Sequence, residues 1–150
     1  DLVRSRGLGD VYKRQTLAEM TREALDLLGH DPDGFFLMVE GSQIDWAAHD
    51  GDDGYFFREM KSFDKAARAV LDFAAGAGNV LVVLTADHET GGLALEGSDA
   101  GTLKLKWTTN DHTAANVPVF SHGPGSERFS GDHDNTDVPR LIAASLGIKF

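Results

Sequence analysis

Acidic and histidine side chains that could bind a metal ion gather in three short stretches of the sequence: Glu40, Asp45 and His49; Asp87 and His88; and His112. The chain has no cysteine, so any metal must be held by nitrogen and oxygen ligands, which suit Zn²⁺ or Mg²⁺ better than soft metals. The formal net charge is -10. This acidity argues against a nucleic-acid partner, and an anionic ligand would need bound cations to attract it.

The first stretch places Asp45 and His49 four residues apart. If a helix begins near Ile44, both side chains lie on one face, one turn apart, and can reach a single cation. The alternative interpretation is an aspartate that caps the helix and a histidine that faces solvent. Spacing alone does not separate the two.

The second stretch puts Asp87 and His88 directly after a wholly apolar run. Polar side chains at the end of a buried strand need partners, so metal ligation is the favoured interpretation. In the alternative, Asp87 caps a turn and His88 is exposed. His112, taken alone, is typical of a surface histidine; it is the combination of the three stretches that indicates a metal centre.

Two apolar runs separated by a helical pattern predict how these stretches are positioned. Residues 34–40 and 80–85 read as strands buried on both faces, and residues 55–75 as a helix. The expected apolar stripe of that helix consists of Phe56, Met60, Phe63, Ala67, Val70 and Ala74. A strand–helix–strand unit makes the strands parallel, and ligands bind at their carboxyl ends.

The remaining elements complete one predicted domain, residues 16–150. A capping box at Thr16 and Glu19 predicts a helix that ends at Leu28. A third apolar segment covers residues 117–120, and a closing helix is expected over 136–146. Residues 1–15 show no periodicity and are interpreted as a non-native, adaptor-derived segment, with an ordinary basic segment as the alternative.

Composition sets further limits. The chain has 150 residues, 41% of them hydrophobic and 25% charged, which is typical of one globular domain. No apolar run approaches the ~20 residues that cross a bilayer, so no membrane span is expected. No signal peptide is visible at the N-terminus.

The runs GFFLMVEGSQIDWAAH and TADHETGG, followed by an isolated DHT and a later Gly-Pro pair, resemble the C-terminal part of the alkaline phosphatase family. The resemblance covers nearly all of the chain from Thr16. It implies an α/β fold of three layers with a mostly parallel central sheet, of which this chain is an incomplete, C-terminal portion. It also implies metal-dependent hydrolysis of phosphate monoesters through a phosphoenzyme intermediate.

The same resemblance implies roles for individual residues. Two zinc ions and one magnesium ion are expected, with the following ligands: Asp45, His49 and His112 for the first zinc, Asp87 and His88 for the second, and Glu40 for magnesium. Trp46 would lie beside the substrate, where some relatives carry a polar or basic residue, although a packing role is equally compatible. The nucleophile and the phosphate-binding arginine of the family lie upstream of the matched region, and Ser42 matches no nucleophile motif.

Several alternatives remain open. A related phosphodiesterase, sulfatase or phosphoglycerate mutase would share the sheet and similar ligands, and a non-catalytic metal-binding module is also compatible. The expected partners are small phosphate monoesters, with neither nucleic acid nor membrane, and the full-length protein could be a homodimer. Periplasmic or secreted localisation is implied by the resemblance alone.

Overall fold

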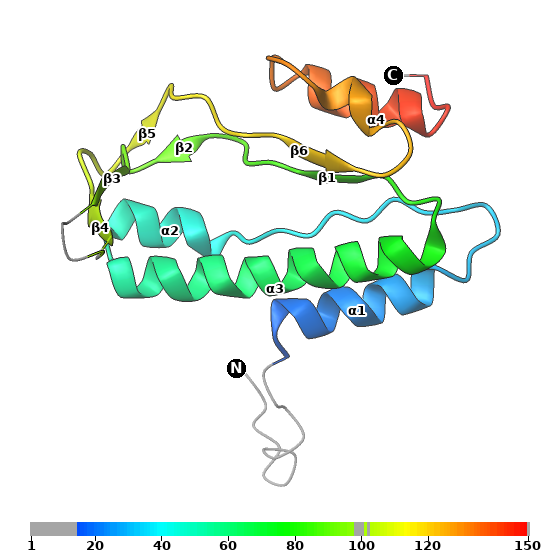
Figure 1. Cartoon of the computed structure of the whole chain (residues 1–150), viewed down its shortest axis with the longest axis horizontal. Helices are drawn as coiled ribbons and strands as arrows, with labels where there is room; N and C mark the ends of the chain where they lie inside the picture. Colours follow the sequence, from blue (N-terminus) through cyan, green and yellow to red (C-terminus); the bar gives the residue numbers. More distant parts are fainter. Residues whose placement is uncertain (1–14, 98–100, 102, 150) are drawn as a thin grey trace, which may run out of the picture.

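The computed structural model describes residues 15–97, 101 and 103–149. Three helices form one layer of the molecule, α1 (Leu17–Leu28), α2 (Gln43–Asp50) and α3 (Asp53–Ala77). A ribbon of short strands runs along this layer, and the C-terminal helix lies on the far side of the ribbon (Figure 1). The proposed foreign segment 1–15 falls almost wholly outside the described residues and stays a prediction.

The first helix begins where the sequence predicts. The Thr16 side chain accepts a hydrogen bond from the Glu19 backbone, and the Glu19 carboxylate accepts one from the Thr16 backbone at 2.8 Å. These reciprocal bonds satisfy amide groups that an uncapped helix leaves without partners. The predicted capping box and helix are therefore confirmed.

The apolar stripe expected on the long helix α3 is confirmed in part, since all its members except Met60 are buried or half-buried. The buried residues of the helix are Ala66, Ala69 and Ala74, while Met60, assigned to the apolar stripe, is 41% exposed. Helix α3 packs mainly against α1 and α2 and also contacts β1, so more than one of its faces is covered. Ala69 faces α1 beside Leu25, where its small side chain lets the two helices approach closely.

Strand pairing is antiparallel throughout the described residues, in three two-stranded ribbons. β1 (Val82–Leu84) pairs with β6 (Phe120–His122), β2 (Glu89–Thr90) with β5 (His112–Thr113), and β3 (Ala94–Gly97) with β4 (Leu103–Lys106). The predicted strand 80–85 contains β1, and the predicted segment 117–120 overlaps β6 at Phe120. The hairpin of β3 and β4 was not predicted.

The predicted strand at residues 34–40 is wrong as a paired strand buried on both faces. The structure assigns no strand there, and exposure alternates along the segment, with Phe36 61% and Met38 74% exposed. The segment runs extended and in the same direction as β1, as a crossover connection requires (Figure 1). No hydrogen-bonded ladder joins it to β1 within the described residues, so the predicted parallel pair is not formed.

After β6 the chain forms a short 3₁₀ helix, η1 (Ser126–Phe129), and then α4 (Asp137–Ser145). The predicted closing helix is confirmed, although Thr136 stands at its N-cap without a side-chain cap bond. Leu25 and Phe129 are the only large hydrophobic residues among the buried core of the described residues. No helix of the described part is long and apolar enough to cross a membrane.

Candidate metal centre

Helix α2 sets the first two ligands of the candidate centre. Asp45 and His49 are one turn apart on this helix, and His49 Nε2 lies 3.4 Å from Asp45 Oδ1. The helix ends directly afterwards at Gly51, whose left-handed backbone (φ 60°) closes it. The i, i+4 spacing therefore brings the carboxylate and the imidazole to one point, as the sequence predicts.

Strand β5 supplies the third ligand. His112 Nε2 lies 3.1 Å from His49 Nε2 and 3.6 Å from Asp45 Oδ1. Ligand atoms of Asp45, His49 and His112 all lie within 4.8 Å of one another. A tetrahedral zinc site with about 2.0–2.2 Å bonds holds its ligand atoms at separations of this order.

Hydrogen bonds around the cluster orient its ligands. His49 Nδ1 lies 2.6 Å from the Asn110 carbonyl oxygen. A carbonyl only accepts, so Nδ1 carries the hydrogen and the Nε2 lone pair is free for a metal. The Thr90 hydroxyl donates to Asp45 Oδ1 at 2.7 Å. Such second-layer bonds fit the chemistry of a zinc site built from two imidazoles and one carboxylate.

His88 joins the same region through its ring. Its imidazole stacks on that of His112, with ring centroids 3.6 Å apart and planes 24° apart. Asp87 Oδ2 lies 3.3 Å from His88 Nε2, and the Asp87 side chain is 86% exposed. The second predicted pair therefore lies at the edge of the first cluster, with a carboxylate open to solvent.

Comparison with known proteins decides the family. The profile of the alkaline phosphatase family matches residues 7–106 and 101–148. This chain belongs to the alkaline phosphatase family. The sequence is 32% identical to alkaline phosphatase 3 of Bacillus subtilis over 87% of this chain, and 36% identical to the streptomycin-6-phosphate phosphatase of Streptomyces griseus over 89%.

Solved structures agree with the sequence match. Alkaline phosphatase from the Antarctic bacterium TAB5 superposes with a TM-score of 0.84 and 34% identity, over 94% of this chain. A variant of the TAB5 enzyme with Mg bound in its M3 site gives a TM-score of 0.83. The chain spans only 43% of the TAB5 chain and 44% of the Bacillus subtilis protein. It has an alkaline phosphatase-like fold, of which these residues form a part.

Two other predicted site residues stand apart from the ligand cluster. Glu40 is exposed at the end of the extended segment, and the structure describes no contact between it and the three clustered ligands. Trp46 follows Asp45 on α2 and is 60% exposed. Neither position contradicts the roles that the alkaline phosphatase resemblance implies, and both roles stay predictions.

Glu89 is a structural neighbour of the cluster to which the sequence interpretation gave no role. Its carboxylate accepts bonds from the Thr113 hydroxyl and from the Gly92 and Leu93 amides, at 3.2 and 3.0 Å for the two amides. Burial raises the pKa of Glu89, but these bonds and the nearby His88 charge outweigh it, so the pKa lies below its ordinary value. Glu89 thus ties the loop after β2 to the strand that carries His112.

The double glycine of the TADHETGG run explains how that loop packs. Gly91 (φ 88°) accepts bonds from the Thr108 and Thr109 amides, and its own amide bonds to the Asp111 carbonyl. A Cβ on Gly91 would lie 2.5 Å from the Trp107 ring. Only glycine combines this positive φ with so close an approach, which fixes the 107–111 segment just before His112.

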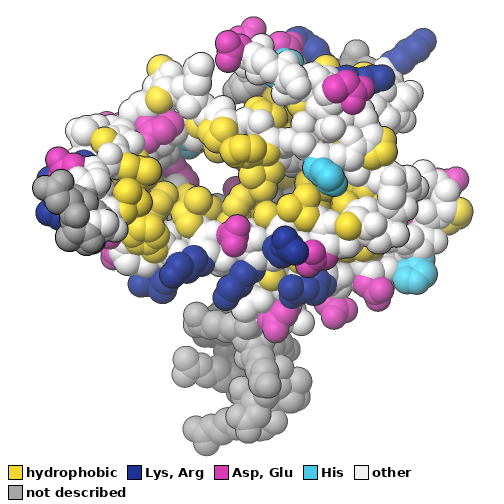
Figure 2. Space-filling model, viewed as in Figure 1, with side chains coloured by type: hydrophobic (Ala, Val, Ile, Leu, Met, Phe, Trp, Pro, Cys, Tyr) yellow, Lys and Arg dark blue, Asp and Glu magenta, His cyan; other side chains and the backbone are white. Residues whose placement is uncertain are grey.

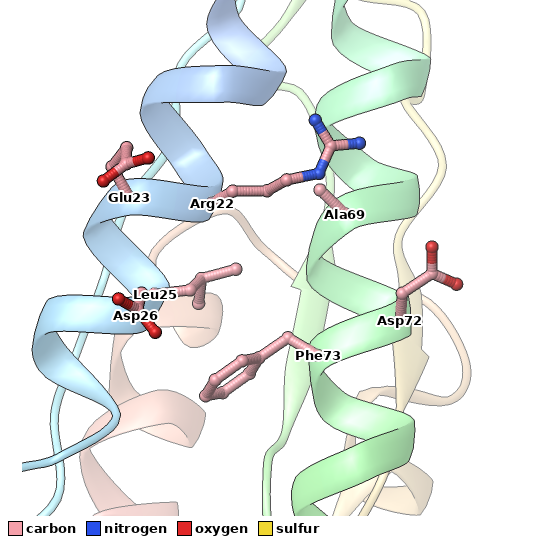
Figure 3. Close-up of a pocket in the computed structure, with 7 residues that line it drawn as sticks. All are labelled: Arg22, Glu23, Leu25, Asp26, Ala69, Asp72 and Phe73. Carbon is pink, nitrogen blue, oxygen red and sulfur yellow. The ribbon is translucent and has the colours of Figure 1, made fainter.

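A separate groove of about 440 Å³ lies between α1 and α3, away from the metal cluster. Figure 3 shows Leu25 and Phe73 on its floor, with charged side chains of both signs around them. Among the described residues, His30, His122 and His133 lie outside the ligand cluster.

Proposed function

We propose that this chain supplies most of the metal ligands of a phosphatase that hydrolyses phosphate monoesters. The convergence of Asp45, His49 and His112 carries the proposal, because side chains from α2 and β5 bring one possible ligand atom each to within 4.8 Å of the others. The family membership of the chain and the metal-bound TAB5 structure support it. The activity belongs to the whole protein, of which the chain spans less than half by comparison with its relatives.

Each ligand has a definite part in the proposed site. His49 holds a nitrogen lone pair toward the first zinc, its tautomer set by Asn110. Asp45 neutralises charge and accepts the Thr90 bond. Zinc bound there would act as a Lewis acid for phosphate oxygens and lower the pKa of bound water. In a chain of net charge -10, such cations supply the attraction for a phosphate dianion.

The remaining ligands complete the proposal. Asp87 and His88 contribute part of a second zinc site, and Glu40 contributes one ligand to a magnesium site. Trp46 forms a wall beside the substrate. The stacking of His88 on His112 supports the closeness of the two zinc sites. The three-layer fold with a mostly parallel central sheet is proposed for the complete protein.

The nucleophile is proposed to lie in the part of the protein outside this chain. Ser42 stands at the N-cap of α2, and its hydroxyl makes no cap hydrogen bond there. A serine nucleophile needs a neighbouring base to take its proton, and the described residues place no such base beside Ser42. The 150-residue chain is therefore expected to bind zinc without hydrolysing phosphate esters. Export, dimerisation and the identity of the monoester remain predictions of the family resemblance.

The decisive experiment joins the N-terminal portion of Bacillus subtilis alkaline phosphatase 3 to Thr16 of this chain and assays the chimera with zinc and magnesium. Metal-dependent hydrolysis of p-nitrophenyl phosphate, greater than that of a matched diester or sulfate ester, would support the monoesterase. Faster diester or sulfate hydrolysis would favour the related hydrolases. Turnover by the 150-residue chain alone would contradict the proposal of an external nucleophile.

A non-catalytic metal-binding module is the second candidate. The absence of an activated nucleophile among the described residues favours it. An inactive, folded chimera that still binds zinc through His49 and His112 would support this function instead.

A further inference from the structure

Trp107 stands at a junction between the elements that carry the metal cluster. It follows β4 directly, and the chain after it leads to His112 at the start of β5. Its side chain is half-buried at the end of the molecule where the β3–β4 hairpin lies beside α2 and the start of α3 (Figure 1). Figure 2 shows hydrophobic side chains gathered over this end, next to the hairpin. The indole therefore lies among the elements that hold both histidines of the cluster.

The indole fits between two glycines that both have a positive φ. A Cβ on Gly51, which ends α2, would lie 3.5 Å from Cγ and Cδ1 on the five-membered side of the ring. A Cβ on Gly91, in the turn after β2, would lie 2.5 Å from Cε3 on the six-membered side and 3.1 Å from the Ala48 carbonyl oxygen. One edge of the ring therefore touches the end of α2, and the other edge touches the turn after β2.

The start of helix α3 holds the ring in one orientation. The indole Nε1–H of Trp107 donates a hydrogen bond to Asp53 Oδ1 at 2.8 Å, and Asp53 is the first residue of α3. The Phe56 ring, one turn further along, meets the indole edge-on, with centroids 5.2 Å apart and planes 80° apart. A hydrogen bond to a charged acceptor and an aromatic contact together restrict the rotation of the side chain.

The backbone after Trp107 connects the indole to both histidines. The Gly91 turn is bonded to this segment through the amides of Thr108 and Thr109 and the carbonyl oxygen of Asp111. Within the segment, the Asn110 carbonyl oxygen lies 2.6 Å from His49 Nδ1. His112 follows, and its Nε2 lies 3.1 Å from His49 Nε2. A shift at the start of the segment therefore moves the hydrogen-bond partner of one histidine and the backbone of the other.

We propose that Trp107 is a positioning residue of the metal centre: held by Asp53, it sets the spacing between His49 on α2 and His112 on β5. Trp107 itself touches neither metal nor substrate, and it acts through the Asn110 carbonyl and the backbone of His112. The inference rests on the proposed function, in which both histidines bind one zinc. Metal ligands must be held to within about 0.5 Å of their binding geometry, so they need rigid support of this kind.

Four variants separate positioning from stability. Asp53→Ala removes the acceptor of the Nε1–H bond, whereas Asp53→Asn keeps an acceptor oxygen there and should restore the bond. Trp107→Phe keeps an aromatic ring but has no N–H to donate. Asp52→Ala is the matched control, because it removes the bond that caps α3 at the Tyr55 amide, 2.8 Å long, and so destabilises the same end of the helix. The structure describes no contact between Asp52 and the indole.

Metal binding by the 150-residue chain gives the first measurement. Competition with a fluorescent chelator should show that Asp53→Ala and Trp107→Phe bind zinc roughly 10-fold more weakly, the lower end of the effect of groups that support metal ligands. Asp53→Asn and Asp52→Ala should keep the affinity of the unsubstituted chain. The visible spectrum of bound Co²⁺ reports the geometry of the ligands, and it should change only in Asp53→Ala and Trp107→Phe.

The tautomer of His49 gives a second measurement, which needs no metal. NMR of the ring nitrogens, at a pH where histidine is neutral, should show the Nδ1–H form in the unsubstituted chain, as the bond to Asn110 requires. The Nε2–H form should appear in Asp53→Ala and Trp107→Phe, because a displaced segment weakens that bond. Urea unfolding checks that each variant is folded, and the two Asp53 variants carry the comparison if Trp107→Phe is not.

The outcomes distinguish this inference from the proposed function. Unchanged zinc affinity and an unchanged tautomer in Asp53→Ala would overturn the positioning role and leave the zinc site intact. An equal loss of affinity in Asp52→Ala would show an effect of stability alone and would also overturn it. If the unsubstituted chain binds no zinc, the proposed function fails, and the tautomer comparison still decides whether Trp107 and Asp53 position His49.

Discussion

His49 donates its Nδ1 hydrogen to the Asn110 carbonyl oxygen across 2.6 Å. The two residues are 61 positions apart in the chain, yet Asn110 lies just before His112, the third residue of the candidate site. One bond thus sets the tautomer of one ligand and fixes the segment that carries another. This arrangement makes the cluster of Asp45, His49 and His112 the central feature of the molecule.

Zinc is expected to stabilise the chain through this cluster. A ligand that binds only the folded state at 100 times its Kd adds about 2.7 kcal/mol, so the Tm should rise measurably with zinc. Replacing His112 with alanine should abolish the rise, since it removes one of three ligands. His122→Ala is the matched control, because His122 lies on β6 outside the cluster. Equal zinc-induced shifts in both variants, measured by differential scanning calorimetry, would contradict this prediction.

Thr90 should tune the same site without touching the metal. Its hydroxyl donates to Asp45 Oδ1 at 2.7 Å, so Thr90→Val leaves the carboxylate free to rotate. Loss of such a second-layer bond weakens metal affinity about 10–100-fold. Competition with a fluorescent zinc chelator measures the change. Thr85→Val is the control, since the Thr85 hydroxyl donates to the neighbouring Ala86 carbonyl and not to a cluster residue among those described. An equal loss of zinc affinity in Thr85→Val would contradict the role of Thr90.

Glu89 gives the stability a specific pH dependence. Its pKa is lowered in the folded chain, so its contribution is present above its ordinary value of 4.5 and is lost as the pH falls through the lowered pKa. Glu89→Gln should cost roughly 1–3 kcal/mol at pH 7, because charged hydrogen bonds to Thr113 and two amides are weakened. Urea unfolding of both proteins should show this difference shrinking toward pH 3. If the difference in unfolding free energy between the two proteins grew as the pH fell, the lowered pKa of Glu89 would be contradicted.

Gly41 tests how tightly the extended segment packs on α3. A methyl group there would lie 2.8 Å from the Phe63 ring and 3.1 Å from Ile44, so Gly41→Ala should destabilise the chain by about 1–3 kcal/mol. Gly76→Ala is the matched control on α3, where a Cβ meets nothing within 4 Å. That substitution should stabilise the helix by about 0.5–1 kcal/mol. If urea unfolding shows that Gly41→Ala is more stable than Gly76→Ala, the close packing of Gly41 on Phe63 is contradicted.

Local sequence patterns predicted the helices and the meeting of Asp45 with His49, because a helix cap and a spacing of one helical turn depend only on neighbouring residues. The capping box of Thr16 and Glu19 fixes the start of α1, and the spacing of Asp45 and His49 needs only one helical turn. His112 was included because the three polar stretches combine into one ligand set, and the family resemblance assigned it to the same zinc as Asp45 and His49, since nothing in its own stretch shows that it meets His49.

Sheet pairing could not be predicted in the same way. The apolar run at 34–40 has strand chemistry, but a strand forms only when a hydrogen-bonding neighbour lies beside it. The described residues provide none, so the segment stays extended and half-exposed. The expected stripe of α3 did not include the buried residues Ala66 and Ala69, because α3 packs against α1, α2 and β1 and so is covered on more than one face. Glu89 stands in the TADHETGG run, but one of its hydrogen-bond partners, Thr113, lies on another strand that the sequence pattern does not place beside it.

The most direct test is a calorimetric titration of zinc into the 150-residue chain and into its His49→Ala variant at neutral pH. The proposed site predicts one tight zinc per chain in the wild type, with a heat change that disappears in the variant. Identical titrations of the two proteins, or no zinc binding by either, would contradict the claim that Asp45, His49 and His112 form a metal centre.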